Sequence, residues 1–523
     1  MNSTHLGYIV AVITVSVGII VYWHLKWSAR RRIGSDTFET FFLAGGRVGR
    51  TLTAHNSWGL GFSFANAIWY FAFLGYYFGP WIFLLQLPWV FSVGCLALLF
   101  RKYVRASQFG TVHGFISHHF GARAALVAAG ATLTGYVLNS GFEMFYSAHL
   151  LSVAFGIQYM ELIIAFLIAV FVAAYCTSGG YYASIVTDRY QNILGTIALG
   201  LLIIMLMPSF VEINGNWSAF TTQAQFSSPP WHFVLGVSVF AFFFNFVDMA
   251  NWQSLAANRD LPTSRFRGVQ VGLLFSASVQ LIVPAFAGVW LGVMLKVMNS
   301  QLADDELIQF AFAKAFQNLG PLTGLVLGIV VFGFLSLTLS SSGSYVVAAM
   351  QTLSLDMFKR REAAIYQDPK TDATTRSLVE RDVLDWAKRN VIAVCLAMVA
   401  TFSTLYYGLR YFESAAIVFQ FQFVMYGAAV TLAPVVLAKL VHSSEAASVT
   451  NHSAGLLSIA LGLLFVIVPF AIAAFFWNTL PLQAVRRIVP FSLAPDAIIN
   501  LTPLLGLIAA LFSYLFLRGR SPA

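Results

Sequence analysis

Hydroxyl-bearing side chains gather between residues 336 and 344, within a long apolar stretch. They are Ser336, Thr338, Ser340, Ser341, Ser342 and Ser344. In a helix, one or two of these hydroxyls, such as those of Ser336 and Thr338, can bond to a carbonyl one turn earlier. The run of three serines instead offers neutral oxygen ligands on adjacent faces. Sodium, a hard cation, would need about five such oxygens, some of them from backbone carbonyls.

An acidic residue, Asp188, lies near the start of another apolar segment, 183–208. An ionised side chain near bilayer depth is costly unless it is paired, so such a residue is a functional hypothesis by default. Asp188 is therefore a second candidate for a functional residue. The alternative is an interfacial role, in which Asp188 pairs with a basic loop, because Arg189 follows it directly.

Two apolar segments contain polar residues near their middle. One reads His-Asn-Ser-Trp-Gly-Leu-Gly-Phe-Ser-Phe-Ala-Asn from 55 to 66, and the other holds polar residues between 245 and 251. Discontinuous helices at matching positions of two inverted halves mark the central site of many secondary transporters. An unwound stretch frees carbonyls for a cation, and a membrane tolerates such backbone only where it is buried or lines a cavity. The alternative is that Gly59 and Gly61 only permit close helix packing.

Further polar side chains could contact a solute beside these interruptions. They are Asn66, Asn139, Glu143, Asn245, Asp248, Asn251, Gln420, Gln422 and Tyr426. Asn and Gln carry both donors and acceptors, which suits amides, amino acids or hydroxylated solutes. Glu143 and Asp248 could meet a cationic group. Alternatively, these two acids could pair internally or act as proton carriers.

The elements that must position these residues are membrane-spanning helices. Hydrophobic residues make up 59% of the 523 and charged residues 10%, with a mean hydropathy of +0.76, whereas a soluble chain carries roughly 25% charged residues. About 20 apolar residues cross a ~30 Å hydrocarbon core as a helix. Thirteen segments qualify, at 6–26, 50–72, 77–100, 122–155, 160–177, 183–208, 232–254, 269–297, 322–354, 389–409, 414–440, 455–477 and 498–518. The predicted fold class is therefore an all-α polytopic membrane protein.

Lys and Arg residues concentrate in alternate loops. They cluster after the first, third, seventh and ninth segments, at 26–50, 101–105, 259–267 and 359–389. The opposite loops at 209–231 and 298–321 hold one Lys and no Arg between them. By the positive-inside rule the basic side is cytoplasmic. We therefore expect a multi-pass protein of the inner (plasma) membrane with its N-terminus outside and its C-terminus in the cytoplasm.

Other protein classes find little support in the sequence. Cys95, Cys176 and Cys395 each fall in an apolar stretch, without the paired spacing of a disulfide framework or metal site. No nucleophile motif, phosphate loop or nucleotide fingerprint occurs, so we expect neither an enzyme nor an ATP-driven pump. The net charge of +9 follows from the oriented loops and not from a nucleic-acid partner. The expected partners are a small-molecule substrate and membrane lipid.

Several short motifs follow one another in a recognisable order. They are Phe38-x-x-Phe41-Phe42-Leu43-Ala44-Gly45-Gly46-Arg47, Gly179-Gly180, Thr187-Asp188-x-x-Gln191, Trp252-Gln253, Ser340-Ser341 and Asp356-Met357-Phe358-Lys359. In combination they resemble the sodium/solute symporter family, over roughly residues 38–440. The chain departs from the family pattern by one extra Gly in the first motif and by Ser254 where Arg is usual. That family contains proline, sugar, sialic acid, urea and monocarboxylate carriers.

The resemblance implies a LeuT-type fold in a single transmembrane domain. In this fold ten core helices form two inverted five-helix repeats, which would cover residues 50–208 and 232–440. Residues 6–26 would form an extra N-terminal helix, and 455–518 two further helices.

The resemblance also implies a sodium site between the first and eighth core helices. Carried over by position, Ser340 and Ser341 would supply hydroxyls. Carbonyl oxygens would come from Leu337, Leu60 and Ser63. Asp188 would lie close by, supporting the site or relaying ion release to the cytoplasm.

The sequence therefore predicts sodium-coupled symport of a small polar organic solute by alternating access. Such a solute could be an amino acid, urea or another amide, a sugar or a monocarboxylate. One alternative is a proton-coupled carrier of the same fold, with Asp188, Asp248 and Glu143 carrying protons. Another is a solute-sensing, transporter-like protein, which we consider less favoured because no signalling module follows the last segment.

Overall fold

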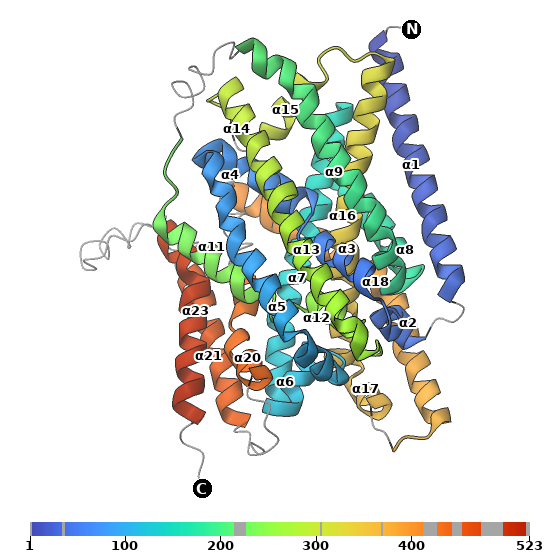
Figure 1. Cartoon of the computed structure of the whole chain (residues 1–523), viewed down its shortest axis with the longest axis vertical. Helices are drawn as coiled ribbons and strands as arrows, with labels where there is room; N and C mark the ends of the chain where they lie inside the picture. The colour runs from blue at the N-terminus through green and yellow to red at the C-terminus, as the bar shows by residue number, and fades with distance from the viewer. Residues whose placement is uncertain are drawn as a thin grey trace, which may run out of the picture.

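The computed structural model describes residues 3–33, 37–157, 159–213, 226–303, 306–367, 370–411, 426–441, 452–471 and 495–518 (Figure 1). These residues form helices joined by turns and extended connections, and no strand occurs among them. Ten stretches of helix are long and apolar enough to cross a membrane, and three shorter apolar helices accompany them. The all-α polytopic architecture predicted from the hydropathy pattern is thus confirmed.

Within the described residues, the thirteen predicted segments fall mainly on helices. In chain order the main helices are α1 (Ser3–Ile33), α2 (Phe38–Leu43), α3 (Arg50–Leu60), η2 (Phe64–Trp69), α4 (Tyr70–Phe78), η3 (Pro80–Gln86), α5 (Leu87–Ala106), α6 (Val112–Phe120), α7 (Ala122–Phe155), α8 (Glu161–Thr177), α9 (Gly180–Ile213), α11 (Trp231–Phe244), α12 (Met249–Ala256), α13 (Phe266–Gln280), η6 (Leu281–Ala287), α14 (Gly288–Met298), α15 (Leu307–Ala315), α16 (Pro321–Thr352), η7 (Leu353–Phe358), α17 (Arg360–Gln367), α18 (Ala373–Tyr411), α20 (Ala433–Val441), α21 (His452–Ala471) and α23 (Pro495–Arg518). The segment predicted at 414–440 is described only from residue 426 onward, and the one at 455–477 only to residue 471. The short helices α2, α6, α15 and α17 are additions that a search for membrane spans does not reveal, because each has nine residues or fewer.

The span predicted at 269–297 has an irregularity that the sequence analysis did not anticipate. A π-helical stretch, η6, separates α13 from α14 and contains Pro284. Proline has no amide to donate to the preceding turn, and its ring displaces the carbonyl there. A local widening of the helix accommodates both effects, as π-bulges commonly do.

Glycines allow several helices to approach one another closely. A Cβ atom on Gly292 of α14 would collide with the Ala72 carbonyl of α4, and one on Gly324 of α16 would collide with the Gly7 carbonyl of α1. Small residues at such crossings let backbones come into contact, which strengthens helix association in a membrane.

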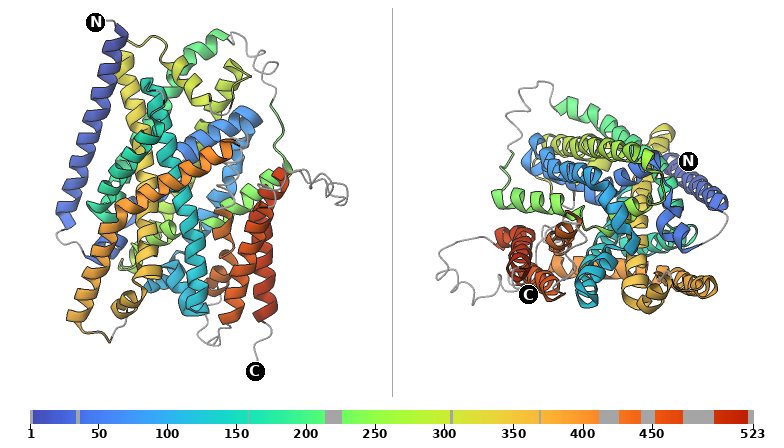
Figure 2. Two further views of the ribbon diagram at one scale, coloured as in Figure 1. Left: turned by 180° about the vertical axis from the view of Figure 1, so that it is seen from behind. Right: turned by 60° about the horizontal axis from the view of Figure 1, so that its bottom comes forward.

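The helices form one elongated bundle. The first helix, α1, stands at one edge, and α21 and α23 stand at the opposite edge in each view (Figures 1 and 2). The long α16 packs against α1, α7 and α9, and its residues from 336 to 352 are all buried. Along the long axis, α1 begins at one end and α23 ends at the other (Figure 1). An odd number of membrane crossings requires this arrangement.

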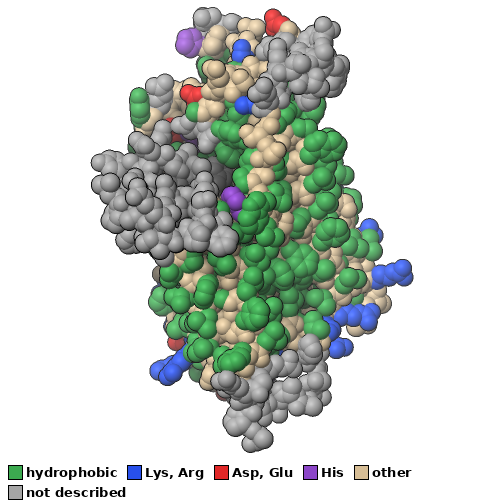
Figure 3. Space-filling view, turned by 90° about the vertical axis from the view of Figure 1, so that its left-hand side faces the viewer, with side chains coloured by type: hydrophobic (Ala, Val, Ile, Leu, Met, Phe, Trp, Pro, Cys, Tyr) green, Lys and Arg blue, Asp and Glu red, His purple; other side chains and the backbone are tan. Residues whose placement is uncertain are grey.

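The outer surface is apolar between the two ends. Ile20 on α1, Leu98 on α5 and Phe512 on α23 are 68%, 81% and 70% exposed. Figure 3 shows hydrophobic side chains covering the middle of one face, with Lys and Arg mostly toward its lower end. So much exposed apolar area is unfavourable in water, and lipid tails are the environment that suits it.

Candidate sodium and solute site

The first polar interruption is a break in the helix, between α3 and η2. The regular ladder ends at Gly61, whose amide donates to the Trp58 carbonyl at 3.1 Å. Ser63 is extended, with φ −124° and ψ 168°, and its carbonyl accepts from the amide of Ile68 at 3.1 Å. The backbone between these points is therefore irregular at the centre of the bundle, as the sequence predicted.

The second interruption is also a break, at residues 245–248 between α11 and α12. Asp248 is extended, with φ −65° and ψ 122°, and caps the start of α12. Its carboxylate accepts from the amides of Ala250 at 3.2 Å and Asn251 at 3.1 Å. Amides in the first turn of a helix have no partner within the helix, so a side-chain acceptor satisfies them.

Asp188 lies in the interior, against the serine cluster of α16. Its side chain is fully buried and accepts from the Ser340 hydroxyl at 2.7 Å and from the Asn56 amide at 2.9 Å. Ser340 in turn faces the first break, because its Oγ is 2.7 Å from where a Cβ on Gly59 would lie. Arg189 points outward and is exposed. The carboxylate of Asp188 thus turns inward to buried donors, which favours a functional role over the interfacial alternative.

Ser341 joins α16 to the same break. Its hydroxyl donates to the carbonyl of Leu337 at 3.1 Å. Leu60, Ser63 and Ser341 line one cavity. A hydroxyl that donates its proton keeps its lone pairs free to bind a cation. The six residues predicted for sodium are thus brought together by three elements, α3 with its break, α9 and α16.

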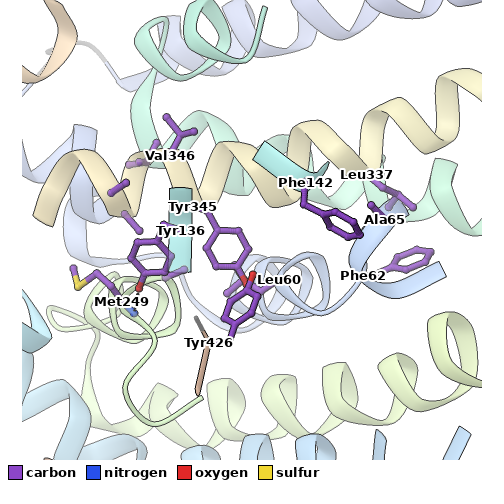
Figure 4. Close-up of a cluster of buried hydrophobic side chains, with 14 of the residues drawn as sticks. Leu60, Phe62, Ala65, Tyr136, Phe142, Met249, Leu337, Tyr345, Val346 and Tyr426 are labelled. Carbon is purple, nitrogen blue, oxygen red and sulfur yellow. Dashed lines mark hydrogen bonds between the residues drawn. The ribbon is translucent and has the colours of Figure 1, made fainter. Parts of the chain in front are cut away.

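The cavity beside these residues is the candidate solute site. It is lined by residues of the first break, η2, α4, η3, α5, α7, α11 and α16. Two predicted solute contacts, Asn139 on α7 and Tyr426, line it. Tyr345 on α16 and Tyr426 point toward one another beside Leu60 (Figure 4).

Other predicted solute contacts lie at the two breaks. The Glu143 carboxylate is fully buried and accepts from the Ala65 amide at 3.2 Å, next to the start of η2. Asn251 donates to the Asn245 side chain at 2.8 Å. Tyr136 donates to Asp248 at 3.0 Å. These polar groups hold the broken backbone in place.

Some predicted contacts have no described side chain, and several lining residues were not predicted. Gln420, Gln422 and the side chain of Asn66 lie outside the described part of the chain. The unpredicted lining residues include Gln86, Trp89, Tyr70, Phe240, Phe244 and Tyr345. Gln86 could have been predicted from the sequence, because it is an amide side chain within the apolar segment 77–100. The aromatic lining residues could not have been predicted, because nothing in the sequence distinguishes them from the other rings among its 49 Phe and 20 Tyr.

The remaining motif residues meet at the end of the bundle predicted to be cytoplasmic. Gln253 on α12 donates to the carbonyl of Phe42 on α2 at 2.6 Å. Asp356, in η7 directly after α16, accepts from the Thr111 hydroxyl at 2.8 Å and pairs with His113 at 2.9 Å. These bonds tie the short helices α2 and α6 to the ends of the core helices.

No protein-family model and no curated protein matches this sequence. Among solved structures, the chain is similar to a Na⁺-coupled sialic acid symporter in a substrate-bound outward-open state, with a TM-score of 0.69 and 14% identity over 100% of this chain and 99% of that one. It is also similar to Mhp1, a nucleobase-cation-symport-1 family transporter in a closed conformation with bromovinylhydantoin bound. That similarity has a TM-score of 0.50 and 12% identity, and covers 92% of this chain and 95% of Mhp1.

These similarities show the fold. The chain is a polytopic membrane protein with the LeuT-type fold of solute transporters, as the motif resemblance implied.

Proposed function

We propose that the protein is a sodium-coupled symporter that carries a small organic solute across the membrane by alternating access. The observation that carries this proposal is the convergence of Leu60, Ser63 and Ser341 on one cavity. Oxygen atoms from a broken helix and from a facing helix are the donor set that a hard cation requires. The similarity to a Na⁺-coupled symporter over the whole chain supports the same conclusion.

The proposed mechanism follows from where these oxygens lie. A sodium ion held between α16 and the first break would join two elements and stabilise the conformation in which they are close. The solute would bind in the adjoining cavity, so that sodium binding and solute binding favour the same state. An inward membrane potential contributes about 2.3 kcal/mol per charge for each 100 mV, which one sodium ion makes available for solute accumulation.

The proposed organisation assigns residues 50–208 and 232–440 to two inverted repeats. The two breaks support this division, because they occur in the first helix of each proposed repeat. The basic loops orient the protein with its N-terminus outside and its C-terminus in the cytoplasm.

Sodium binding can be measured without knowing the solute. Purified protein should bind radioactive sodium saturably, and Ser341→Ala should weaken that binding by about tenfold or more, as the loss of one ligand from a small oxygen set implies. Ser336→Ala is the matched control, because its hydroxyl donates to the Phe332 carbonyl at 2.8 Å on the same helix and does not line the cavity.

Equal sodium binding by the wild type and Ser341→Ala would contradict the proposed sodium site. If sodium does not bind while a pH gradient alone drives solute uptake, the proton-coupled alternative replaces the proposal. The buried acids Glu143 and Asp248 are the specific observation that favours that alternative.

A further inference from the structure

Seven of the seventeen residues that line the central cavity are aromatic. Rings from α4, α5, α11, α16 and the stretch that begins at Tyr426 face it, among them Tyr70, Trp89, Phe240, Phe244, Tyr345 and Tyr426. Tyr426 packs edge-on against Phe244 with centroids 4.9 Å apart and against Phe240 at 5.2 Å. None of the described residues that line the cavity is Lys, Arg or His. The cavity therefore offers ring surfaces and a few neutral polar groups, and no basic group for an anion.

The two positions in a broken-helix site that best attract an anion are already filled by side chains. The starts of half-helices carry free amides and a positive dipole end, which bind carboxylates and phosphates. Here the Glu143 carboxylate accepts from the Ala65 amide beside η2. At the start of α12, Asp248 accepts from the amides of Ala250 and Asn251. A carboxylate on the solute would have to displace one of these acids and remain next to it.

The acid at the second break bonds to Tyr136, whose ring packs against the aromatic wall. Tyr136 donates to Asp248 at 3.0 Å, and the ring of Tyr136 packs on that of Tyr345 with centroids 5.6 Å apart. Tyr345 faces the cavity (Figure 4). The arrangement places an acidic group two rings from the cavity, with Tyr136 and Tyr345 between them. In a water-poor interior, such a group acts at this range with little screening.

We propose that the solute is an organic cation, with an alkylated ammonium group held against these rings. Ring faces attract such cations, most strongly where water is excluded. Gln86 and Asn139, which also line the cavity, would bond to a hydroxyl or amide elsewhere on the solute. The proposal rests on the proposed transport function, and among the solutes considered for it, monocarboxylates are disfavoured.

Matched small molecules test the charge directly. The thermal unfolding midpoint of the purified full chain is measured at constant ionic strength, in sodium or potassium chloride, against choline, its neutral carbon isostere with a tert-butyl group, and butyrate. A ligand of the folded state raises the midpoint, and its concentration dependence yields Kd. Choline should bind in sodium about tenfold or more tighter than its neutral isostere, and butyrate should give no shift.

Two variants localise the effect. Phe240→Leu removes a ring from the cavity and should weaken choline binding while leaving the shift caused by sodium alone unchanged. Phe83→Leu makes the same change on η3 at a ring that contacts Phe286 outside the cavity, and should leave both shifts unchanged.

The outcomes separate this inference from the proposed function. Equal shifts with choline and its neutral isostere, a larger shift with butyrate, or no shift with choline would each overturn the organic-cation proposal. The sodium shift and its loss in Ser341→Ala test sodium coupling independently of all three. A choline shift without any sodium shift would keep the solute class and overturn the coupling ion.

Discussion

At the scale of single residues, the candidate ion site contains two serine hydroxyls that already donate hydrogen bonds to other groups. Ser340 donates to Asp188 and Ser341 to the Leu337 carbonyl. Both oxygens therefore keep lone pairs that could bind a cation. The Ser336 hydroxyl donates to the Phe332 carbonyl one turn earlier, which confirms the local hydrogen bond expected for it.

Asp188 should determine how tightly sodium binds. In Asp188→Asn, a single amide oxygen must replace two carboxylate oxygens that accept from Ser340 and Asn56, and a negative charge near the ion is lost. Hydrogen bonds to charged groups contribute about 1.5–3 kcal/mol, so we expect sodium affinity to fall about tenfold or more. Titrating the unfolding midpoint with sodium measures this change.

Arg189→Gln is the control for that experiment. Arg189 is adjacent in sequence but exposed, so its replacement should leave sodium affinity unchanged. A loss of affinity in Arg189→Gln as large as in Asp188→Asn would restore the interfacial interpretation of Asp188.

At the scale of elements, each broken helix restarts beside an acidic side chain. Glu143 of α7 bonds to the amide of Ala65 by the first break, and Asp248 caps α12 after the second. Tyr136, also on α7, donates to Asp248 and accepts from the Met249 amide. One long helix thus supports both restarts, which explains how irregular backbone persists at the centre of the bundle.

The cap on α12 should be measurable as stability. Asp248→Ala leaves the amides of Ala250 and Asn251 without their acceptor and should cost about 0.5–2 kcal/mol. Asp248→Asn keeps a side-chain oxygen and should recover most of that loss. The unfolding midpoints of the two variants, measured without solute, report the difference; equal loss in both would show that the negative charge, and not the cap, stabilises the break.

At the scale of the whole molecule, the distribution of charge and the course of the chain indicate the same orientation in the membrane. The helices α1 and α23 reach opposite ends of the bundle, and the short helices α2, α6 and α17 lie toward the lower end (Figure 1). The basic loops of the sequence flank these short helices. By the positive-inside rule, we therefore expect that end to lie in the cytoplasm.

Labelling from one side of the membrane tests this orientation. In a Cys95→Ala background, Gln301→Cys should react with a membrane-impermeant maleimide on intact cells, and Thr374→Cys only after permeabilisation. Both positions are exposed, and Cys176 and Cys395 are buried. The reverse labelling pattern would invert the proposed topology.

The sequence alone was sufficient for the spans, the two interruptions and the grouping of serines. These features are local: twenty apolar residues, a pair of glycines or three adjacent hydroxyls are each visible within one helix. The boundaries of α7 and α8 were predicted to within a residue, because polar or glycine residues end both apolar runs.

Only the tertiary structure decided which of these residues meet. That Asp188 turns inward to Ser340, 152 positions away, depends on how α9 packs against α16. The aromatic walls of the cavity come from helices distant in sequence, and in a chain with 49 Phe no local signal separates a ring that faces a solute from one that faces lipid. Long-range contacts of this kind depend on packing between faces, and a periodic pattern shows that a face is apolar without showing what lies against it.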